Sequence, residues 1–438
     1  MKNIMLFCVL ILTFGCIDDH PSSLDQSARF IKYFGTTGNE GVVDMVETMS
    51  GEILILGYTN TPNGDNDFYI VKTDSAGNGI WQESYNYDDG IDGNSASQDI
   101  PASARLFNND QNLLAIGTSN ISDTLRIFLL NIDVATGQAI ESFAYQYYDD
   151  RIQNVAIDNI GAKSTSGADI LYNEANDEFI ILGSVETWSK DLYLSDPQSI
   201  LLMSVDAKTF APKWHDLTGL RSEDAGVKLI EDNGRYFYIS TVTIPVGNPT
   251  GYGNKDVFVV EFNPSSGVAI NSGYYGTAGA DVPNNIVSFN NFLFVTGTSG
   301  DVQSEQAFFL RVPKSLPEEN IDFVNIDVTN GDFNFTATGT QGLDLVRLNN
   351  GDVYIAGQIN GFRTEDGEFK ENEIGIFRVD AFGSLDLDNF RVYGSEDNDK
   401  ADAIILRADG TLVIGATVDF GSTSMMSLLK TNVWGEFK

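Results

Sequence analysis

An internal repeat is the feature of this sequence that most restricts its fold. The segment "MSGEILILGYT" (Met49–Thr59) recurs as "NNGDVYIAGQI" (Asn349–Ile359). Weaker copies are centred on five other small residues, namely Gly117, Gly183, Ser240, Gly297 and Ala416. Each of the seven copies has a tight Asn, Asp or Gly turn, then a short β-prone run, then a small residue. The pattern therefore predicts a chain of seven similar β units.

Further β-prone segments accompany every copy. One follows it, as in "DFYIVKTDSAG" (Asp67–Gly77), and another precedes it, as in "GLDLVRL" (Gly342–Leu348). Six copies have a fourth segment, which often ends in an aromatic residue and Gly, as in "FRVYG" (Phe390–Gly394). Units of four short antiparallel strands, repeated every roughly 55–65 residues, predict an all-β fold, a seven-bladed β-propeller of four-stranded antiparallel blades. A right-handed β-solenoid is the alternative, but its rungs are shorter and lack such hairpin turns.

The two ends of the chain predict how the ring closes. The seventh unit has three strands and then stops at Lys438, while an unpartnered strand, "ARFIKYFG" (Ala28–Gly35), precedes the first unit. An open ring would leave exposed sheet edges, which promote aggregation. We therefore expect the N-terminal strand to complete the last blade.

The first residues have the features of a secretory signal. A short basic start is followed by an apolar run, Ile4–Phe14, that is too short to span a bilayer. The run ends in "LTFGC", which resembles a lipobox with Cys16 as the acylated residue, and the following Ile17-Asp18-Asp19 resembles the acidic export signal of Bacteroidota lipoproteins. We therefore expect a lipoprotein signal peptide at 1–15, a tether at 16–27 and a propeller at 28–438. An ordinary signal peptide with an incidental cysteine is the alternative.

The repeats also resemble a known group. The segments "YFGTTGNEG", "GEILILGYT" and "DFYIVKTDSAGNGIW", which lie between Tyr33 and Trp81, are similar to the SBBP-like β-propeller repeats of secreted and surface proteins of Bacteroidota. The resemblance covers nearly all of the expected mature chain. It implies a propeller fold and an outer-membrane, surface-exposed location, and it says little about activity, because propellers have unrelated functions.

Charge and histidine content restrict the chemistry. A formal net charge of −36 disfavours nucleic acid and anionic lipid surfaces as partners. Of the two histidines, His20 lies in the tether and His215 in a fourth-strand position, so we expect neither a histidine-based metal site nor a Ser/His/Asp relay. Asp44 and Asp344 occupy equivalent innermost strands and could meet at the central channel, where hydration of a wet pore is the simpler interpretation.

Calcium is the one cofactor that the sequence leaves open. Carboxylates alternate in the loop "NGDND", with Asp65 and Asp67, and in "EDNDKAD", with Asp397 and Asp399. Such spacing suits oxygen-ligand sites, but neither segment matches the twelve-residue helix-loop-helix calcium site. We expect no other cofactor and no catalytic residue.

The strand order predicts two unequal faces. The first-to-second and third-to-fourth turns are short throughout, whereas the second-to-third and blade-to-blade connections are long and varied. Binding is therefore expected on the face with the long connections. Five aromatic residues in these connections are the candidate binding residues, with packing inside their own loops as the alternative: Trp188, Tyr193, Tyr252, Phe362 and Phe369.

Two functions from different classes fit these features. The first is a non-enzymatic surface lipoprotein, a scaffold subunit of an outer-membrane complex such as a nutrient-uptake transporter or the outer-membrane assembly machinery. The second is a glycan-binding protein, or a carboxylate-dependent polysaccharide hydrolase or lyase.

Overall fold

The structure is a computed structural model of the 438-residue chain. It describes residues 29–60, 64–87, 97–121, 124–148, 151–154, 163–186, 198–243, 253–300, 305–318, 322–328, 335–364, 370–395 and 397–437. The expected signal peptide and tether, including Cys16, lie outside these ranges. In the described part of the chain, no helix is long and apolar enough to cross a bilayer.

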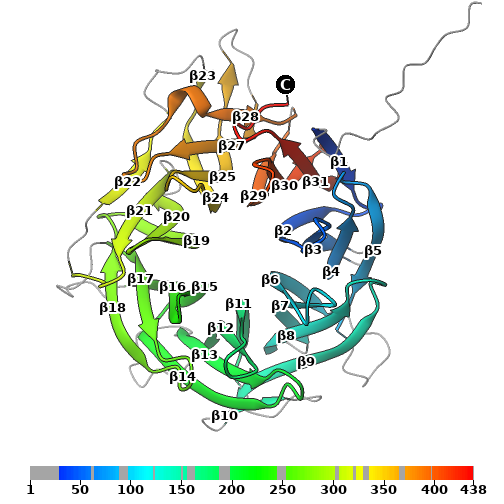
Figure 1. Cartoon of the computed structure of the whole chain (residues 1–438), viewed down its shortest axis with the longest axis vertical. Helices are drawn as coiled ribbons and strands as arrows, with labels where there is room; N and C mark the ends of the chain where they lie inside the picture. The colour runs from blue at the N-terminus through cyan, green and yellow to red at the C-terminus, as the bar shows by residue number, and fades with distance from the viewer. Residues whose placement is uncertain are drawn as a thin grey trace, which may run out of the picture.

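Seven antiparallel sheets surround a central axis, as predicted (Figure 1). Blade 1 is formed by β2 (Glu40–Glu47), β3 (Ile53–Asn60), β4 (Asn66–Thr73) and β5 (Gly79–Tyr85). Blade 2 is formed by β6 (Gln98–Phe107), β7 (Asn112–Ile121), β8 (Thr124–Asp133), β9 (Ala139–Tyr148) and β10 (Arg151–Asn154). Blade 3 is formed by β11 (Thr165–Asn173), β12 (Glu178–Glu186), β13 (Gln198–Asp206) and β14 (Pro212–Ser222). In these three blades the strands run from the axis outward in chain order.

Blades 4 to 7 repeat this arrangement. Blade 4 is formed by β15 (Ala225–Asp232), β16 (Arg235–Thr243), β17 (Lys255–Phe262) and β18 (Ala269–Tyr275), and blade 5 by β19 (Ala280–Phe289), β20 (Phe292–Gly300), β21 (Gln306–Pro313) and β22 (Asp322–Ile326). Blade 6 is formed by β24 (Gly339–Arg347), β25 (Val353–Asn360), β27 (Asn372–Val379) and β28 (Arg391–Tyr393). Blade 7 is formed by β29 (Lys400–Leu406), β30 (Leu412–Asp419), β31 (Ser424–Thr431) and, outermost, β1 (Phe30–Phe34).

Two details depart from identical blades. The second blade carries β10 as a fifth strand, and two short strands, β23 (Phe335–Thr336) and β26 (Arg363–Thr364), pair beside the sixth blade. Parallel bridges also link neighbouring blades, namely Gln198 to Glu223, Lys255 to Ala280 and Asn372 to Asn398.

The small residue at the end of each repeated segment has a structural cause. Every innermost strand contains a register shift at the same place, for example between Val42 and Asp44 in β2 and between Gly342 and Asp344 in β24. This bulge directs a backbone carbonyl at the second strand. A Cβ on Gly57 would lie 1.9 Å from the Gly41 carbonyl oxygen, so glycine is needed there.

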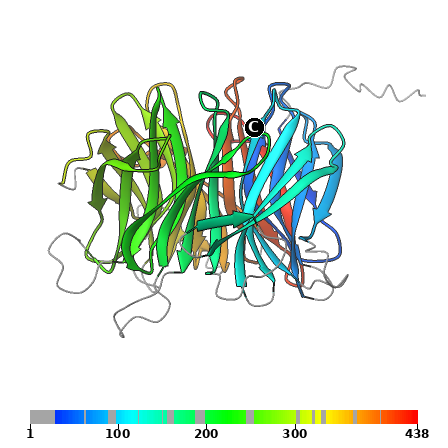
Figure 2. The ribbon, with the colours of Figure 1, turned by 90° about the horizontal axis from the view of Figure 1, so that it is seen from below.

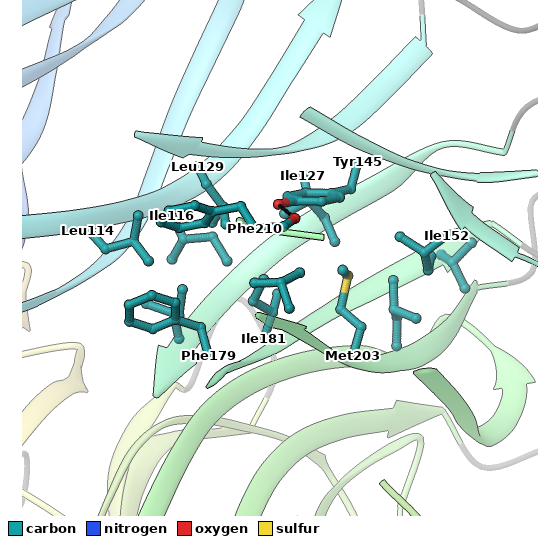
Figure 3. Packing of buried hydrophobic residues seen from close by; sticks show 14 residues of the cluster. Leu114, Ile116, Ile127, Leu129, Tyr145, Ile152, Phe179, Ile181, Met203 and Phe210 are labelled. Atoms are coloured by element: carbon teal, nitrogen blue, oxygen red, sulfur yellow. Dashed lines mark hydrogen bonds between the residues drawn. The ribbon is translucent and has the colours of Figure 1, made fainter. Parts of the chain in front are cut away.

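The hydrophobic core is divided among the seams between neighbouring blades. Figure 3 shows the seam between blades 2 and 3, where Leu129 and Tyr145 pack against Phe179, Met203 and their neighbours. The Tyr145 hydroxyl donates a hydrogen bond of 2.7 Å to the Phe210 carbonyl oxygen across this seam. Each sheet therefore needs a neighbour on both faces, and the ring must close.

Closure occurs as predicted from the two chain ends. β1 pairs antiparallel with β31, from Phe30 opposite Lys430 to Phe34 opposite Met426. The inward-facing Phe30 and Phe34 pack against the core between blades 7 and 1, whereas Ile31 and Tyr33 are exposed. The N-terminal strand thus completes the seventh blade.

Carboxylates on the innermost strands join consecutive blades. Asp44 in blade 1 accepts a hydrogen bond of 3.0 Å from the Ala104 amide in blade 2. In the same way, Asp169 accepts from the Leu229 amide at 2.7 Å, and Asp344 accepts from the Ile404 amide at 2.7 Å. Hydrogen bonds to a charged acceptor contribute roughly 1.5–3 kcal/mol each, so these three links stabilise the ring next to its channel.

The two faces differ as the strand order predicted. The turns at 48–52, 74–78, 348–352 and 407–411 define what we call the short-turn face, which also carries the C-terminus (upper side in Figure 2). The opposite, long-loop face carries the β1–β2 connection and residues 276–279, 394–395 and 397–399. Because β1 runs antiparallel to β31, Phe30 lies on the short-turn face and Phe34 towards the long-loop face.

The closing strand provides a test of the fold. Replacing both Phe30 and Phe34 with Ala removes apolar burial from the seam between blades 7 and 1. We expect the free energy of unfolding to fall by about 2–4 kcal/mol, less than for two fully buried phenylalanines. Chemical denaturation measures it, with exposed Ile31→Thr as a control that should change stability by less than about 1 kcal/mol. An unaltered denaturation midpoint in the double variant would show that β1 does not hold the ring closed.

Candidate functional site

The long-loop face is hollowed in two places and leads into the central channel. A cavity of about 250 Å³ lies in the channel. A groove of about 890 Å³ crosses blades 4 to 6 on the long-loop face, and it shares Asn284 and Leu343 with the channel cavity. The cavity and the groove are therefore adjacent. A separate hollow of about 600 Å³ lies over blades 1 and 7 and is lined by residues such as Asn39, Asp67 and Thr423.

Bulged residues of all seven innermost strands surround the channel cavity. They form an apolar ring with two polar members, and they are Val43, Ala102, Ala168, Val227, Asn284, Leu343 and Asp402. The same bulge therefore has two effects. It requires a small residue in the second strand, and it determines which side chains of the innermost strand line the channel.

Charged side chains lie in and directly behind the wall of the cavity, where Asp44 and Lys228 belong to the lining. Arg105 pairs with Asp169 at 2.9 Å and with Asp44 at 3.4 Å. Lys228 lies 3.8 Å from each of the same two carboxylates. These two basic groups thus share two acids. Burial raises the pKa of Asp44, but Lys228 and Arg105 outweigh it and hold this pKa below its usual value.

Asp344, which also lines the cavity, has a different environment. Its carboxylate accepts hydrogen bonds from Asn285 and from the amides of Leu345 and Ile404. Within the described ranges no basic side chain forms an ion pair with it. Burial raises the pKa of Asp344 to about 6, although the hydrogen bond from Ile404 and the charge of Lys228 oppose the rise. Asp44 and Asp344 therefore line one cavity, as their equivalent positions suggested, and both also link blades.

A second ion pair lies at the rim of the cavity. Lys400 contacts Asp402 at 2.7 Å, and the Thr417 hydroxyl donates to the other oxygen of Asp402 at 2.6 Å. Burial raises the pKa of Asp402, although Lys400 opposes that rise. Tyr58 lines the cavity beside this pair, with its hydroxyl close to the backbone of Gly41. The rim can therefore offer hydrogen-bond donors and acceptors without net charge.

Buried acids at the starts of inner strands accept hydrogen bonds from main-chain amides. The sequence spacing that suggested calcium ligands did not predict this role. Asp99 accepts from the Tyr87 amide at 2.7 Å, and Glu40 accepts from the Thr36 amide at 3.1 Å. Asp399 likewise accepts from the amides of Ser395 and Asp419. These carboxylates fasten the blade-to-blade connections. Asp399, a calcium candidate, is fully buried and uses both oxygens in this way.

The other calcium candidates lie near two seams. Asp65 and Asp67 lie close to Asp99 between blades 1 and 2, and Asp397 lies in the connection before β29. Among the described residues, no group of three or more His, Cys, Asp or Glu side chains is arranged to hold a metal ion. Burial raises the pKa of Asp67 to about 6, and its neighbours Asp99 and Asp65 add to this rise.

The candidate aromatic residues have different outcomes. Trp188, Tyr193, Tyr252 and Phe369 lie outside the described ranges. Phe362 is only 9% exposed and packs with the hydrophobic cluster of blades 5 and 6, so we leave it out of the binding surface. This matches the alternative in which such a side chain packs within the fold.

His215 lies on β14, the fourth strand of blade 3, where the sequence placed it. Its ring contacts Tyr147, with 5.7 Å between the ring centroids in an edge-to-face arrangement. A histidine in such a contact on an outer strand is far from the channel. The charged groups of the channel, Arg105, Asp169, Lys228, Lys400 and Asp402, were missed. Alignment of the inner strands at the bulge would have placed Asp169 and Lys228 at the position of Asp44 and Asp344.

Comparisons with known proteins support the fold alone. No protein-family model and no curated protein matches the chain by sequence. Among solved structures, hydrazine synthase from Kuenenia stuttgartiensis matches 90% of this chain and 97% of its own, with 9% identity and a TM-score of 0.51. A puromycin-hydrolysing peptidase from Mycobacterium tuberculosis matches 89% of this chain, with 10% identity and a TM-score of 0.43. The chain spans about half (52%) of that peptidase. Propeller-containing proteins thus share this architecture, with diverse functions.

The acids between blades 1 and 2 provide a test based on pH. The folded protein holds the protons of Asp67 and Asp99 more tightly than the unfolded chain does, since burial raises both pKa values to about 6 from an unfolded value of about 4. Each group therefore lowers stability as the pH rises from about 4 to about 6. Asp67→Asn should raise the melting temperature at pH 8 and have little effect at pH 4.

The control for this test has the opposite sign. Asp409 on the short-turn face accepts hydrogen bonds from the Thr411 hydroxyl and amide, at 2.6 and 2.9 Å. Asp409→Asn should therefore lower the melting temperature at pH 8. If Asp67→Asn lowers it as well, the two buried acids do not repel each other in the folded protein.

Proposed function

We propose that this protein is a lipid-anchored, non-enzymatic surface protein that binds a protein subunit of an outer-membrane complex through its long-loop face. One observation carries the proposal. The chain enters β1 on the short-turn face, while the groove and the long connections lie on the opposite face. A tether from Cys16 would therefore leave the long-loop face accessible to a partner.

Charge supports a protein partner with a basic surface. The chain has 62 acidic and 26 basic residues, so its field attracts basic surfaces and speeds association with them. The partner would be an integral membrane protein, such as a nutrient-uptake transporter or a component of the assembly machinery. The repeats' resemblance to those of surface proteins of Bacteroidota adds to this proposal.

No observation favours the alternative of polysaccharide hydrolysis. Asp44 and Asp344, the carboxylates considered for such chemistry, each bind the main chain of the next blade through Oδ2. A carboxylate that links blades has to keep its position, which suits a structural role better than general acid–base catalysis.

A bulky side chain in the groove tests which face binds. Ala278 is exposed at the groove, and Ala408 is exposed in a turn of the short-turn face. Ala278→Trp should reduce the amount of co-purifying integral membrane protein from detergent-extracted outer membranes by at least about tenfold, because clashes at an interface cost several kcal/mol. The matched Ala408→Trp should leave recovery unchanged. If only Ala408→Trp reduces recovery, the partner binds the short-turn face and the proposed face is wrong.

The anchor is tested separately. Cys16→Ala removes the acylation site, so the protein should appear in the soluble fraction after a high-salt wash that dissociates protein partners. Electrophoretic mobility and mass should show loss of the acyl groups. Retention of the variant in washed outer membranes would mean that lipid does not anchor this protein.

A further inference from the structure

We propose that the channel cavity receives the cationic end of a lysine or arginine side chain that the partner protein inserts from the long-loop face. This inference rests on the proposed function, because it names what the partner has to present to the ring.

The charges around the cavity are unbalanced by one. Three carboxylates, Asp44, Asp344 and Asp402, and two basic groups, Lys228 and Lys400, line it. Behind the lining, Arg105 pairs with Asp169 and Asp44, so four acids face three basic groups in all. The basic groups contact the other three acids, and Asp344 remains without an ion pair in the described part of the chain. Asp344 is half-buried, and Lys228 acts on it only from beyond ion-pair distance, so its charged form is only partly compensated. A bound monocation would neutralise it.

The hydrogen bonds of Asp344 leave room for such a cation. Its Oδ1 accepts from Asn285 and the Leu345 amide, whereas, among the described residues, its Oδ2 accepts only from the Ile404 amide. A carboxylate oxygen has capacity for two acceptor interactions. One acceptor position on Oδ2 is therefore free, on a side chain that lines the cavity.

The shape of the cavity suits a flexible chain with a charged tip. Its volume of about 250 Å³ lies below the range of roughly 300–1,000 Å³ that is usual for drug-sized ligands. Val43, Val227 and Leu343 in its wall offer apolar contact to methylene groups. The groove that shares Leu343 and Asn284 with the cavity gives the rest of the partner a place to bind outside.

Small probes of defined charge test the proposal on the purified full-length protein. Nα-acetyl-lysine methylamide is titrated while the methyl NMR signals of Val43, Val227 and Leu343 are followed. We expect saturable shifts of these three residues at pH 7.5. The norleucine analogue has a similar alkyl chain without the charge, and it should bind at least about tenfold more weakly. Equal binding of both probes would contradict the proposal.

Asp344 is tested in two independent ways. Asp344→Asn should weaken binding of the lysine probe at least about tenfold, after its folding has been checked by its melting temperature. Lowering the pH from 7.5 to 5 should weaken binding in the unaltered protein about tenfold, because Asp344 becomes protonated while the probe keeps its charge. The neighbouring Asp44 stays ionised over this range. Binding that is independent of both pH and Asp344 would overturn the assignment.

The outcome separates this inference from the proposed function. If Ala278→Trp abolishes partner recovery but the lysine probe shows no Asp344-dependent binding, the face assignment stands and this inference fails. If the probe binds as expected while Ala278→Trp leaves recovery intact, the cavity binds cations but the partner uses another surface.

Discussion

The pairing of β1 with β31 is the interaction on which the rest of the structure depends. Sheets that bury both faces against neighbours cannot leave one blade incomplete without exposing an edge and part of a core. The first strand, β1, fills the edge of the seventh blade by pairing with β31, close to the other end of the chain. Because β1 runs antiparallel to β31, β1 begins on the short-turn face. The same pairing therefore closes the ring and determines on which face the propeller begins.

The channel shows how a structural need produces a chemical environment. A bulge in every inner strand brings side chains to the axis, and three of the acids placed there accept hydrogen bonds from the main chain of the next blade. Arg105 and Lys228 lie within ion-pair distance of two of these acids, Asp44 and Asp169, whereas they act on Asp344 only from farther away. Asp344 is therefore fixed in place for stability and at the same time available to a cation.

The sequence predicted the architecture well because the repeat, the turn residues and the incomplete last unit each have a direct structural cause. Blade number, closure and the asymmetry of the faces were confirmed. The site was predicted only in part. Asp44 and Asp344 were recognised by their equivalent positions, but partners such as Arg105 lie elsewhere in the repeat and are brought together only by the ring. Phe362 looked like an exposed loop residue, yet packing between blades buries it.

The central claim is that the face opposite the start of β1 is the one that meets the partner. Amide hydrogen exchange measured on the protein alone and in detergent-extracted outer membranes tests this claim directly. We predict new protection at the groove residues Ala278, Gly279, Ala280, Thr298 and Gly300, and unchanged exchange in the turns at 74–78 and 407–411. Protection confined to those short turns would contradict the account.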